Sequence, residues 1–239
     1  RKIFFFVAIY FLLFLSNANA ATFVSGSTGV DGAFSPAVST EVQLPTNGIF
    51  NFTTVNIPSG VTVTFKKNAA NTPVYILATG DVAISGTISV NGGSTNSSTG
   101  RNPGSGGSGG YDGGHGGIAG VSGGAGGKGL GPGGGGAGYP GTYISGGGGG
   151  FGSSGGCYIQ SCSYAPGGST YGNSRLIPLI GGSGGGGSAT YLSYVMPGGG
   201  GGGGAILIAT SGTITIAGSL QSNGGSSYYL SNLGSITSG

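Results

Sequence analysis

The side chains that could carry acid–base chemistry are few in this sequence, and only two of them lie close together. The chain has one histidine, His115, and four carboxylates, Asp31, Glu41, Asp81 and Asp112. Asp112 and His115 are separated by two glycines, but a Ser–His–Asp mechanism needs a scaffold that holds all three groups in place. A solvated polar turn is the favoured interpretation of this cluster. The sequence therefore predicts a protein that is not an enzyme.

Cofactor, metal and nucleic-acid sites are not predicted. The poly-glycine runs lack the Gly-Lys-Ser/Thr ending of a phosphate loop, since Lys128 stands in Gly-Lys-Gly-Leu. The two cysteines and the one histidine lie in different segments, which does not suit a metal centre. Charged residues make up 5% of the chain and the formal net charge is +3, so a basic patch for phosphate backbones is not expected.

The amino terminus has the three parts of a secretory signal peptide. Arg1 and Lys2 precede the apolar run 3–15, and a small-residue stretch ends in Ala-Asn-Ala-Ala. We predict a leader over residues 1–20, whose removal lowers the formal net charge from +3 to +1. A membrane anchor is one alternative, although the apolar run is shorter than the roughly 20 residues of a spanning helix. An uncleaved assembly helix is another.

Cysteine and tyrosine supply the remaining site candidates. In an exported protein, Cys157 and Cys162 are expected to form a local disulfide, with pairing between molecules as the alternative. Ten of the twelve tyrosines lie from Tyr111 onward, and their amphipathic rings suit sugar faces and other proteins. Two close pairs form the candidate contact surface: Tyr191, Tyr194, Tyr228 and Tyr229. The competing interpretation is that these rings only cover glycine-rich backbone.

Both flanks of the glycine-rich region are expected to be β. Residues 82–90 alternate apolar and small side chains, a period of two that is typical of a strand with one buried face. This pattern is repeated 132 residues later: residues 80–94 align with residues 212–226, with identical residues at seven of the fifteen positions. Just upstream, Leu77-Ala78-Thr79 matches Ile208-Ala209-Thr210 with one residue of slippage.

This repeat predicts an all-β fold of parallel β-helix or solenoid-like coils, with a β-sandwich as the alternative. We divide the mature chain into an N-terminal β region (21–91), a glycine-rich insert (92–204) and a C-terminal β coil (205–239) that repeats 80–94. The last coil has no evident cap in the sequence. Its exposed edge is expected either to join another subunit or to be followed by more chain.

The insert holds 49 of the 62 glycines, and many of them recur at every third position. A period of three is that of the polyproline II helix, which has no internal hydrogen bonds. Glycine on the packed faces would let several such helices approach and bond to one another. Collagen is excluded because the phase breaks and the chain has only 10 prolines. We expect packed polyglycine II-type helices, with a flexible linker as the alternative.

Parts of the sequence resemble recurring text in glycine-rich exported bacterial proteins of uncharacterised function. The similar stretches are Tyr171-Gly172-Asn173 with Leu176, and the segments 178–185, 204–209 and 77–82. The resemblance implies a bacterial envelope or surface location and no activity. Separately, the period-three glycine is similar, in composition only, to the polyglycine bundles of some antifreeze proteins and phage tail adhesins.

Together these features predict a secreted, extracellular or cell-surface structural protein that associates with itself as a fibre or matrix subunit. The basis is the low charge, the unclosed β edge and a glycine backbone that needs hydrogen-bond partners. The alternative is an adhesin or glycan-binding module that uses tyrosines on glycine-rich loops. An ice-binding variant is third, suggested by Thr62-x-Thr64 and Thr213-x-Thr215. Surface glycans are the second expected partner, and no stable membrane span is expected once the leader is removed.

Overall fold

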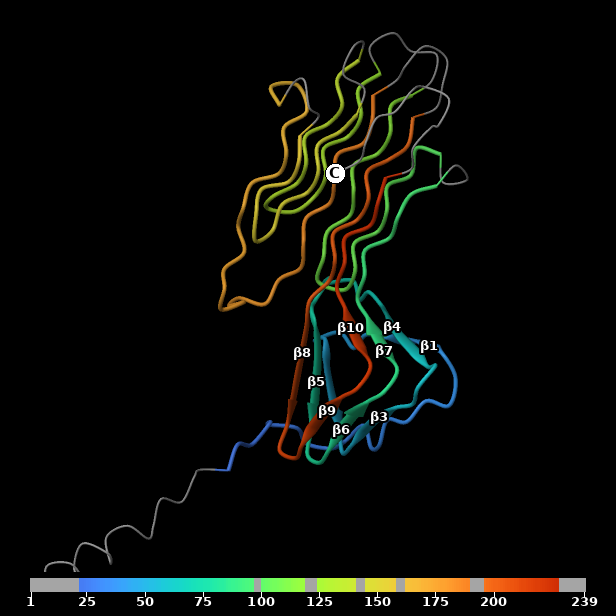
Figure 1. Ribbon diagram of the computed structural model, residues 1–239, viewed down its shortest axis with the longest axis vertical. Coiled ribbons are helices and arrows are strands. Elements are labelled where there is room, and N and C mark those ends of the chain that lie inside the picture. The colour runs from blue at the N-terminus through green and yellow to red at the C-terminus, as the bar shows by residue number, and fades with distance from the viewer. Residues whose placement is uncertain are drawn as a thin grey trace, which may run out of the picture.

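The computed structural model describes residues 22–96, 100–118, 124–140, 145–157, 162–189 and 196–227. Within these ranges every regular element is a β-strand, which confirms the all-β prediction. Since no helix forms among them, none is long and apolar enough to cross a membrane. The strands gather in one part of the molecule, and long extended glycine-rich segments run from there toward the opposite end (Figure 1).

The strands form three sheets in which all pairs are parallel, in the part of the chain described. The sheet orders are β1-β4-β7-β10, β2-β5-β8 and β3-β6-β9, so each of the last three passes of the chain adds one strand to every sheet, and β1 is a fourth strand in one of them. This arrangement is consistent with the expected coils. The strands are β1 (Thr40–Gln43), β2 (Ile49–Phe52), β3 (Val55–Ile57), β4 (Thr62–Lys66), β5 (Val74–Ala78), β6 (Val82–Ile84), β7 (Thr87–Ser89), β8 (Ile206–Thr210), β9 (Ile214–Ile216) and β10 (Ser219–Gln221).

The sequence repeat is also a structural repeat. Val82 lies opposite Ile214, 132 positions later, and the same spacing holds in all three sheets. The expected slippage, which matched Leu77 with Ile208, is wrong because Leu77 lies opposite Ala209. The physical reason is that a slip of one residue would exchange the inward and outward faces of the strand.

The core lies between the three sheets, where successive passes stack apolar side chains in rows. We call residues 74–89, which contain β5 to β7, the preceding layer, and residues 206–221, which contain β8 to β10, the last layer. The inward-facing apolar side chains of the preceding layer and of the one before it are almost fully buried. The cluster comprises Leu44, Phe50, Phe52, Val55, Ile57, Val61, Val63, Val74, Ile76, Ala78, Val82, Ile84, Ile88 and Val90.

A short N-terminal segment, residues 25–29, crosses the layers and ties them together. The Ser25 backbone N–H donates to Ser211 Oγ (3.1 Å), and Ser25 Oγ donates to the carbonyl oxygen of Ala78 (2.6 Å). Ser27 Oγ donates to the carbonyl oxygen of Phe52 (2.9 Å). Since Ser211, Ala78 and Phe52 belong to three successive passes, this segment spans the stack and begins beside the last layer.

Candidate functional site

The described residues of 92–204, together with 222–227, form what we call the glycine bundle. In its central segment, residues 181–189, the backbone N–H groups from Gly182 to Ser188 donate to three neighbouring segments in rotation, so that every third residue faces the same neighbour, and Gly181 donates to Gly109. Gly182, Gly185 and Ser188 donate to the carbonyl oxygens of Gly203, Gly200 and Pro197, respectively. Ser183 and Gly186 donate to those of Gly150 and Gly147. Gly184 and Gly187 donate to those of Leu130 and Gly127. The hydrogen bonding therefore repeats with the same period of three that the sequence shows.

Glycine is required along these contacts because neighbouring backbones lie where a side chain would begin. A Cβ on Gly184 would fall on the carbonyl group of Asp112, and one on Gly187 would fall on the carbonyl group of His115. A Cβ on Gly202 would meet the carbonyl group of Gly182 in the same way. In each case the obstacle is backbone rather than the end of a flexible side chain, so the segments would have to move apart.

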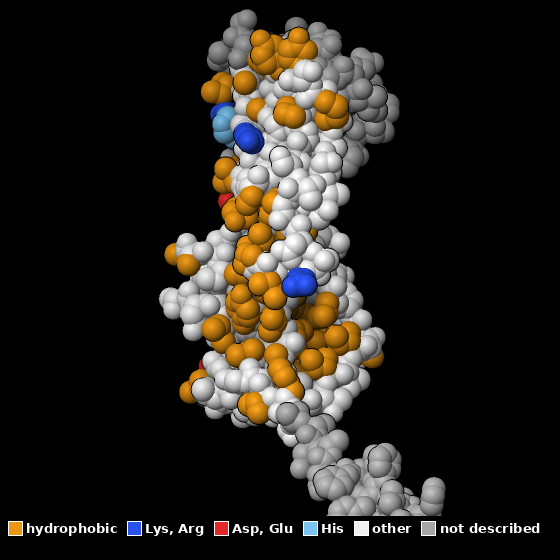
Figure 2. All heavy atoms as spheres, turned by 90° about the vertical axis from the view of Figure 1, so that its left-hand side faces the viewer, with side chains coloured by type: hydrophobic (Ala, Val, Ile, Leu, Met, Phe, Trp, Pro, Cys, Tyr) orange, Lys and Arg blue, Asp and Glu red, His pale blue; other side chains and the backbone are white. Residues whose placement is uncertain are grey.

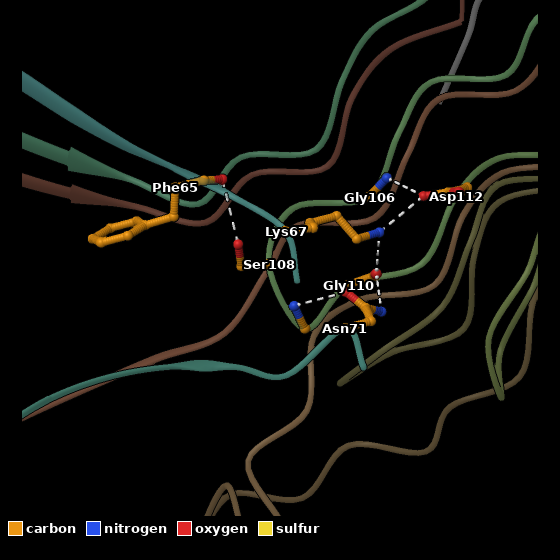
Figure 3. Close-up of polar contacts among 8 residues, drawn as sticks. Phe65, Lys67, Asn71, Gly106, Ser108, Gly110 and Asp112 are labelled. Carbon is orange, nitrogen blue, oxygen red and sulfur yellow. Dashed lines mark hydrogen bonds and ion pairs between the residues drawn. The ribbon is translucent and has the colours of Figure 1, made fainter. Parts of the chain in front are cut away.

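A polar cluster joins the glycine bundle to the strands (Figure 3). Lys67, just after β4, forms an ion pair with Asp112 (Nζ to Oδ1, 3.0 Å) and donates to the carbonyl oxygen of Gly110 (3.3 Å). Asn71 donates to the same carbonyl oxygen (2.8 Å), and its own Oδ1 accepts the N–H of Gly109 (3.1 Å). We call Lys67, Asn71, Gly109, Gly110 and Asp112 the junction cluster.

The contacts of Asp112 favour its ionised form. Partial burial of the carboxylate opposes ionisation, but the N–H of Gly106 (2.7 Å) and the ammonium group of Lys67 outweigh burial and hold the pKa of Asp112 below its ordinary value. His115 does not take part, because its Nδ1 lies 3.2 Å from the carbonyl oxygen of the adjacent Gly116. The Asp112–His115 pair singled out in the sequence is thus not brought into one site, and Asp112 serves the junction instead.

The other carboxylates also make local structural contacts. Asp31 Oδ2 accepts the N–H of Asn51 (2.6 Å), and Asp81 Oδ1 accepts the N–H of Thr213 in the next layer (2.8 Å). Glu41 is exposed on β1. No group of three or more His, Cys, Asp or Glu side chains that could hold a metal occurs among the described residues.

The remaining site candidates are distributed as follows. The structure joins Cys157 and Cys162 in a disulfide, with their Cα atoms 5.1 Å apart. All four candidate contact tyrosines lie outside the described residues: Tyr191, Tyr194, Tyr228 and Tyr229. Thr62 and Thr64 lie on β4, whereas Thr215 lies on β9 in a different sheet, so the two threonine pairs do not form a common array.

The last layer exposes apolar side chains whose counterparts one layer earlier are buried. Ile214, Ile216 and Leu220 retain 42%, 48% and 42% of their accessible surface, against 1%, 1% and 2% for Val82, Ile84 and Ile88 directly opposite. We call this side of β8, β9 and β10, on which no strand from the described part of the chain packs, the open end. In Figure 2, which shows the side of the molecule on which β8 lies in Figure 1, hydrophobic side chains gather over the strand-bearing part with few charges among them.

Comparison with known proteins offers no relative from which a function could be transferred. No protein-family model, curated protein or solved structure matches the chain. Three features of the chain itself therefore bear on its function: the open end, the junction cluster and the glycine bundle.

Proposed function

We propose that the chain is a non-enzymatic extracellular structural protein that associates with itself, as a subunit of a fibre, a matrix or a cell-surface layer. The observation that carries this proposal is the open end, where a complete layer of inward-facing apolar side chains has no covering layer among the described residues. Burial of apolar surface is the main driving force for association. The very low charge of the chain leaves little electrostatic repulsion to oppose it.

The architecture that we propose is a parallel β-solenoid that carries a bundle of polyglycine II-type helices. Support for the solenoid comes from three parallel sheets that each take one strand from each of the last three passes. Support for the helices comes from the three-residue rotation of hydrogen bonds around the central segment, because polyproline II geometry has three residues per turn. A segment bonded in several directions is a stiff projection, unlike a flexible glycine linker.

The roles of the ionisable groups support a protein without catalysis. A general acid or base at neutral pH needs a pKa near the working pH. Asp112 instead has a lowered pKa and is engaged by Lys67 and Gly106. Asp31 and Asp81 accept backbone hydrogen bonds within the strand-bearing part.

Electron microscopy of the chain without its predicted leader (residues 21–239), both purified and on the surface of the cells that make it, tests this proposal. Regular particles larger than one copy, fibres or an ordered surface layer are expected. Single copies at every concentration, with no ordered material on cells, would contradict the self-association.

An adhesin or glycan-binding module is the second candidate. It is favoured by the pair Tyr139 and Tyr164, whose rings lie 5.4 Å apart and are each about half exposed. Rings arranged in this way offer an amphipathic surface to a sugar face. A glycan array should then show binding that is lost in Tyr139→Ala and Tyr164→Ala, and an array without any binding would reject this candidate.

A further inference from the structure

We propose that the open end binds the open end of a second copy around a two-fold axis, so that assembly begins with a closed dimer. This inference rests on the proposed self-association and specifies which surface the partner presents. The alternative is head-to-tail stacking, in which the open end of one copy binds the opposite end of the next and a fibre grows directly. The difference between the two ends disfavours this alternative.

The open end has the properties of an unprotected sheet edge. β8, β9 and β10 each stand last in their sheet, so one side of each strand has no strand partner among the described residues. Natural edge strands are usually protected by charges or proline. Residues 206–221 contain no charged residue and no proline. Both the apolar layer and the backbone groups are therefore available to another sheet edge.

The opposite end of the stack is closed. Segment 31–34 occupies the edge of β3, where the Phe34 N–H donates to the carbonyl oxygen of Thr54 (2.9 Å) and the Phe34 carbonyl oxygen accepts the N–H of Asn56 (2.8 Å). The Phe34 ring stacks on Phe52 with the ring centroids 5.0 Å apart. The layer beneath is therefore covered by the chain itself, and a second copy gains little by binding there.

β1, which also stands first in its sheet at that end, carries protective residues. Pro36 precedes β1, Pro45 follows it, and Glu41 lies exposed on the strand. Val30 and Val38 are exposed at this end, at 77% and 70%, but they stand outside the strands. The two ends are therefore unlike, and an open end fits another open end better than it fits the closed one.

A two-fold axis across the open ends matches the lengths of the strands. With the axis through β8, that five-residue strand pairs with its own counterpart in antiparallel orientation. The three-residue strand β9 of each copy then pairs with the three-residue strand β10 of the other copy. Such an interface is isologous and closes after two copies.

The N-terminal segment adds apolar surface at the same place. Ser25 bonds to Ser211, in the turn after β8, so Phe23 and Val24 begin beside the last layer. These two side chains are 64% and 73% exposed. Residues 228–239 are a different potential occupant. They follow Ser226, whose N–H is bonded within the glycine bundle to Ser94 Oγ rather than beside β8.

Analytical ultracentrifugation of residues 21–239 over a wide concentration range tests the pairing. We expect a monomer–dimer equilibrium at concentrations below those at which any larger species forms. Ile216→Lys and Leu220→Lys should each weaken dimerisation on the order of 100-fold, because the pair would bury unpaired ammonium groups. Val30→Lys and Val38→Lys are matched controls at the closed end and should leave the equilibrium unchanged. Circular dichroism verifies that each variant keeps its β structure.

The other outcomes separate this inference from the proposed function. Open-ended growth that Val38→Lys abolishes would overturn the two-fold pairing while leaving self-association in place. A wild-type monomer at every concentration would overturn both. If that monomer became a dimer on deletion of residues 228–239, the chain's own tail would be the occupant of the open end, and the pairing of native copies would be rejected.

Discussion

Replacing Gly187 by alanine should destabilise the glycine bundle, whereas the same replacement at Gly152 should not. The Cβ of an alanine at position 187 would fall on the carbonyl group of His115, which belongs to a neighbouring backbone segment. At position 152 a Cβ meets nothing within 4 Å. Neither glycine has a positive φ, so alanine fits the backbone conformation at both sites and the two variants differ only in packing.

The magnitude follows from what the bundle loses when two segments move apart. The segment that contains His115 is joined to the central segment by the Gly114 N–H, which donates to the carbonyl oxygen of Gly185 (2.8 Å), and by the Gly117 N–H, which donates to the carbonyl oxygen of Ser188 (2.8 Å). Each net hydrogen bond is worth about 1 kcal/mol, and forcing an extra methyl group into a packed interior costs about 1–3 kcal/mol. We expect a loss of about 2–4 kcal/mol, or about 5–15 °C in Tm for a chain of this size. Gly152→Ala should be neutral or stabilising by up to about 1 kcal/mol.

Differential scanning calorimetry of the two variants and the wild type gives the comparison, and amide hydrogen exchange locates the change. Exchange should accelerate in residues 181–189 of Gly187→Ala before it does so in β5 to β7. If Gly187→Ala melted within about 1 °C of Gly152→Ala, the close approach of backbones would not stabilise the bundle, and the polyglycine II interpretation would be refuted.

Three further predictions concern single contacts. Because the pKa of Asp112 is lowered in the folded state, its contribution to stability is present above the ordinary carboxyl pKa of about 3.9 and is lost as the pH falls through the folded value. Asp112→Asn should therefore flatten the acid limb of a Tm-versus-pH profile, and an unchanged limb would contradict this role. Ser183→Ala leaves the buried N–H of Gly133 without its 2.9 Å partner and should cost about 1–3 kcal/mol in urea unfolding; a loss below about 0.5 kcal/mol would show that this hydrogen bond matters little. Replacing Cys157 and Cys162 by serine opens a short loop and should cost about 2 kcal/mol without changing the oligomeric state, whereas wild-type dimers that dissociate only on reduction would indicate pairing between molecules.

The β layers were predictable from sequence because inward positions repeat. The alternation over 82–90 and its return 132 residues later identified strands that lie side by side, as Val82 and Ile214 do. The error at Leu77 arose because matching by identity aligned the alanines of two strands, whereas the structure keeps the inward rows together. The short first strands, such as β1, alternate too weakly to be singled out.

The junction cluster could not be predicted from one sequence. Lys67 and Asp112 are 45 positions apart, with three strands between them, and neither the alternation in the strands nor the three-residue spacing of the glycines indicates that these two side chains meet. Asn71 contacts Gly109 and Gly110, where only backbone atoms take part on the bundle side. A side chain that contacts only backbone atoms can face any residue type, so the sequence contains no complementary side chain that would indicate the contact.

The strands also explain how a bundle so rich in glycine can be ordered. Ordering glycine costs more conformational entropy than ordering any other residue, so the segments need their ends fixed before their hydrogen bonds can form in register. The spacing of 132 residues continues from the sheets into the bundle, where the N–H of Asn223 donates to Asn91 Oδ1 and the N–H of Ser226 donates to Ser94 Oγ. Stacked layers thus deliver pairs of glycine segments already aligned, and the central segment adds the bonds that hold the remaining segments around it. The repeated Asn-Gly-Gly-Ser sequence is therefore the point at which the register of the β layers is transferred to the glycine bundle.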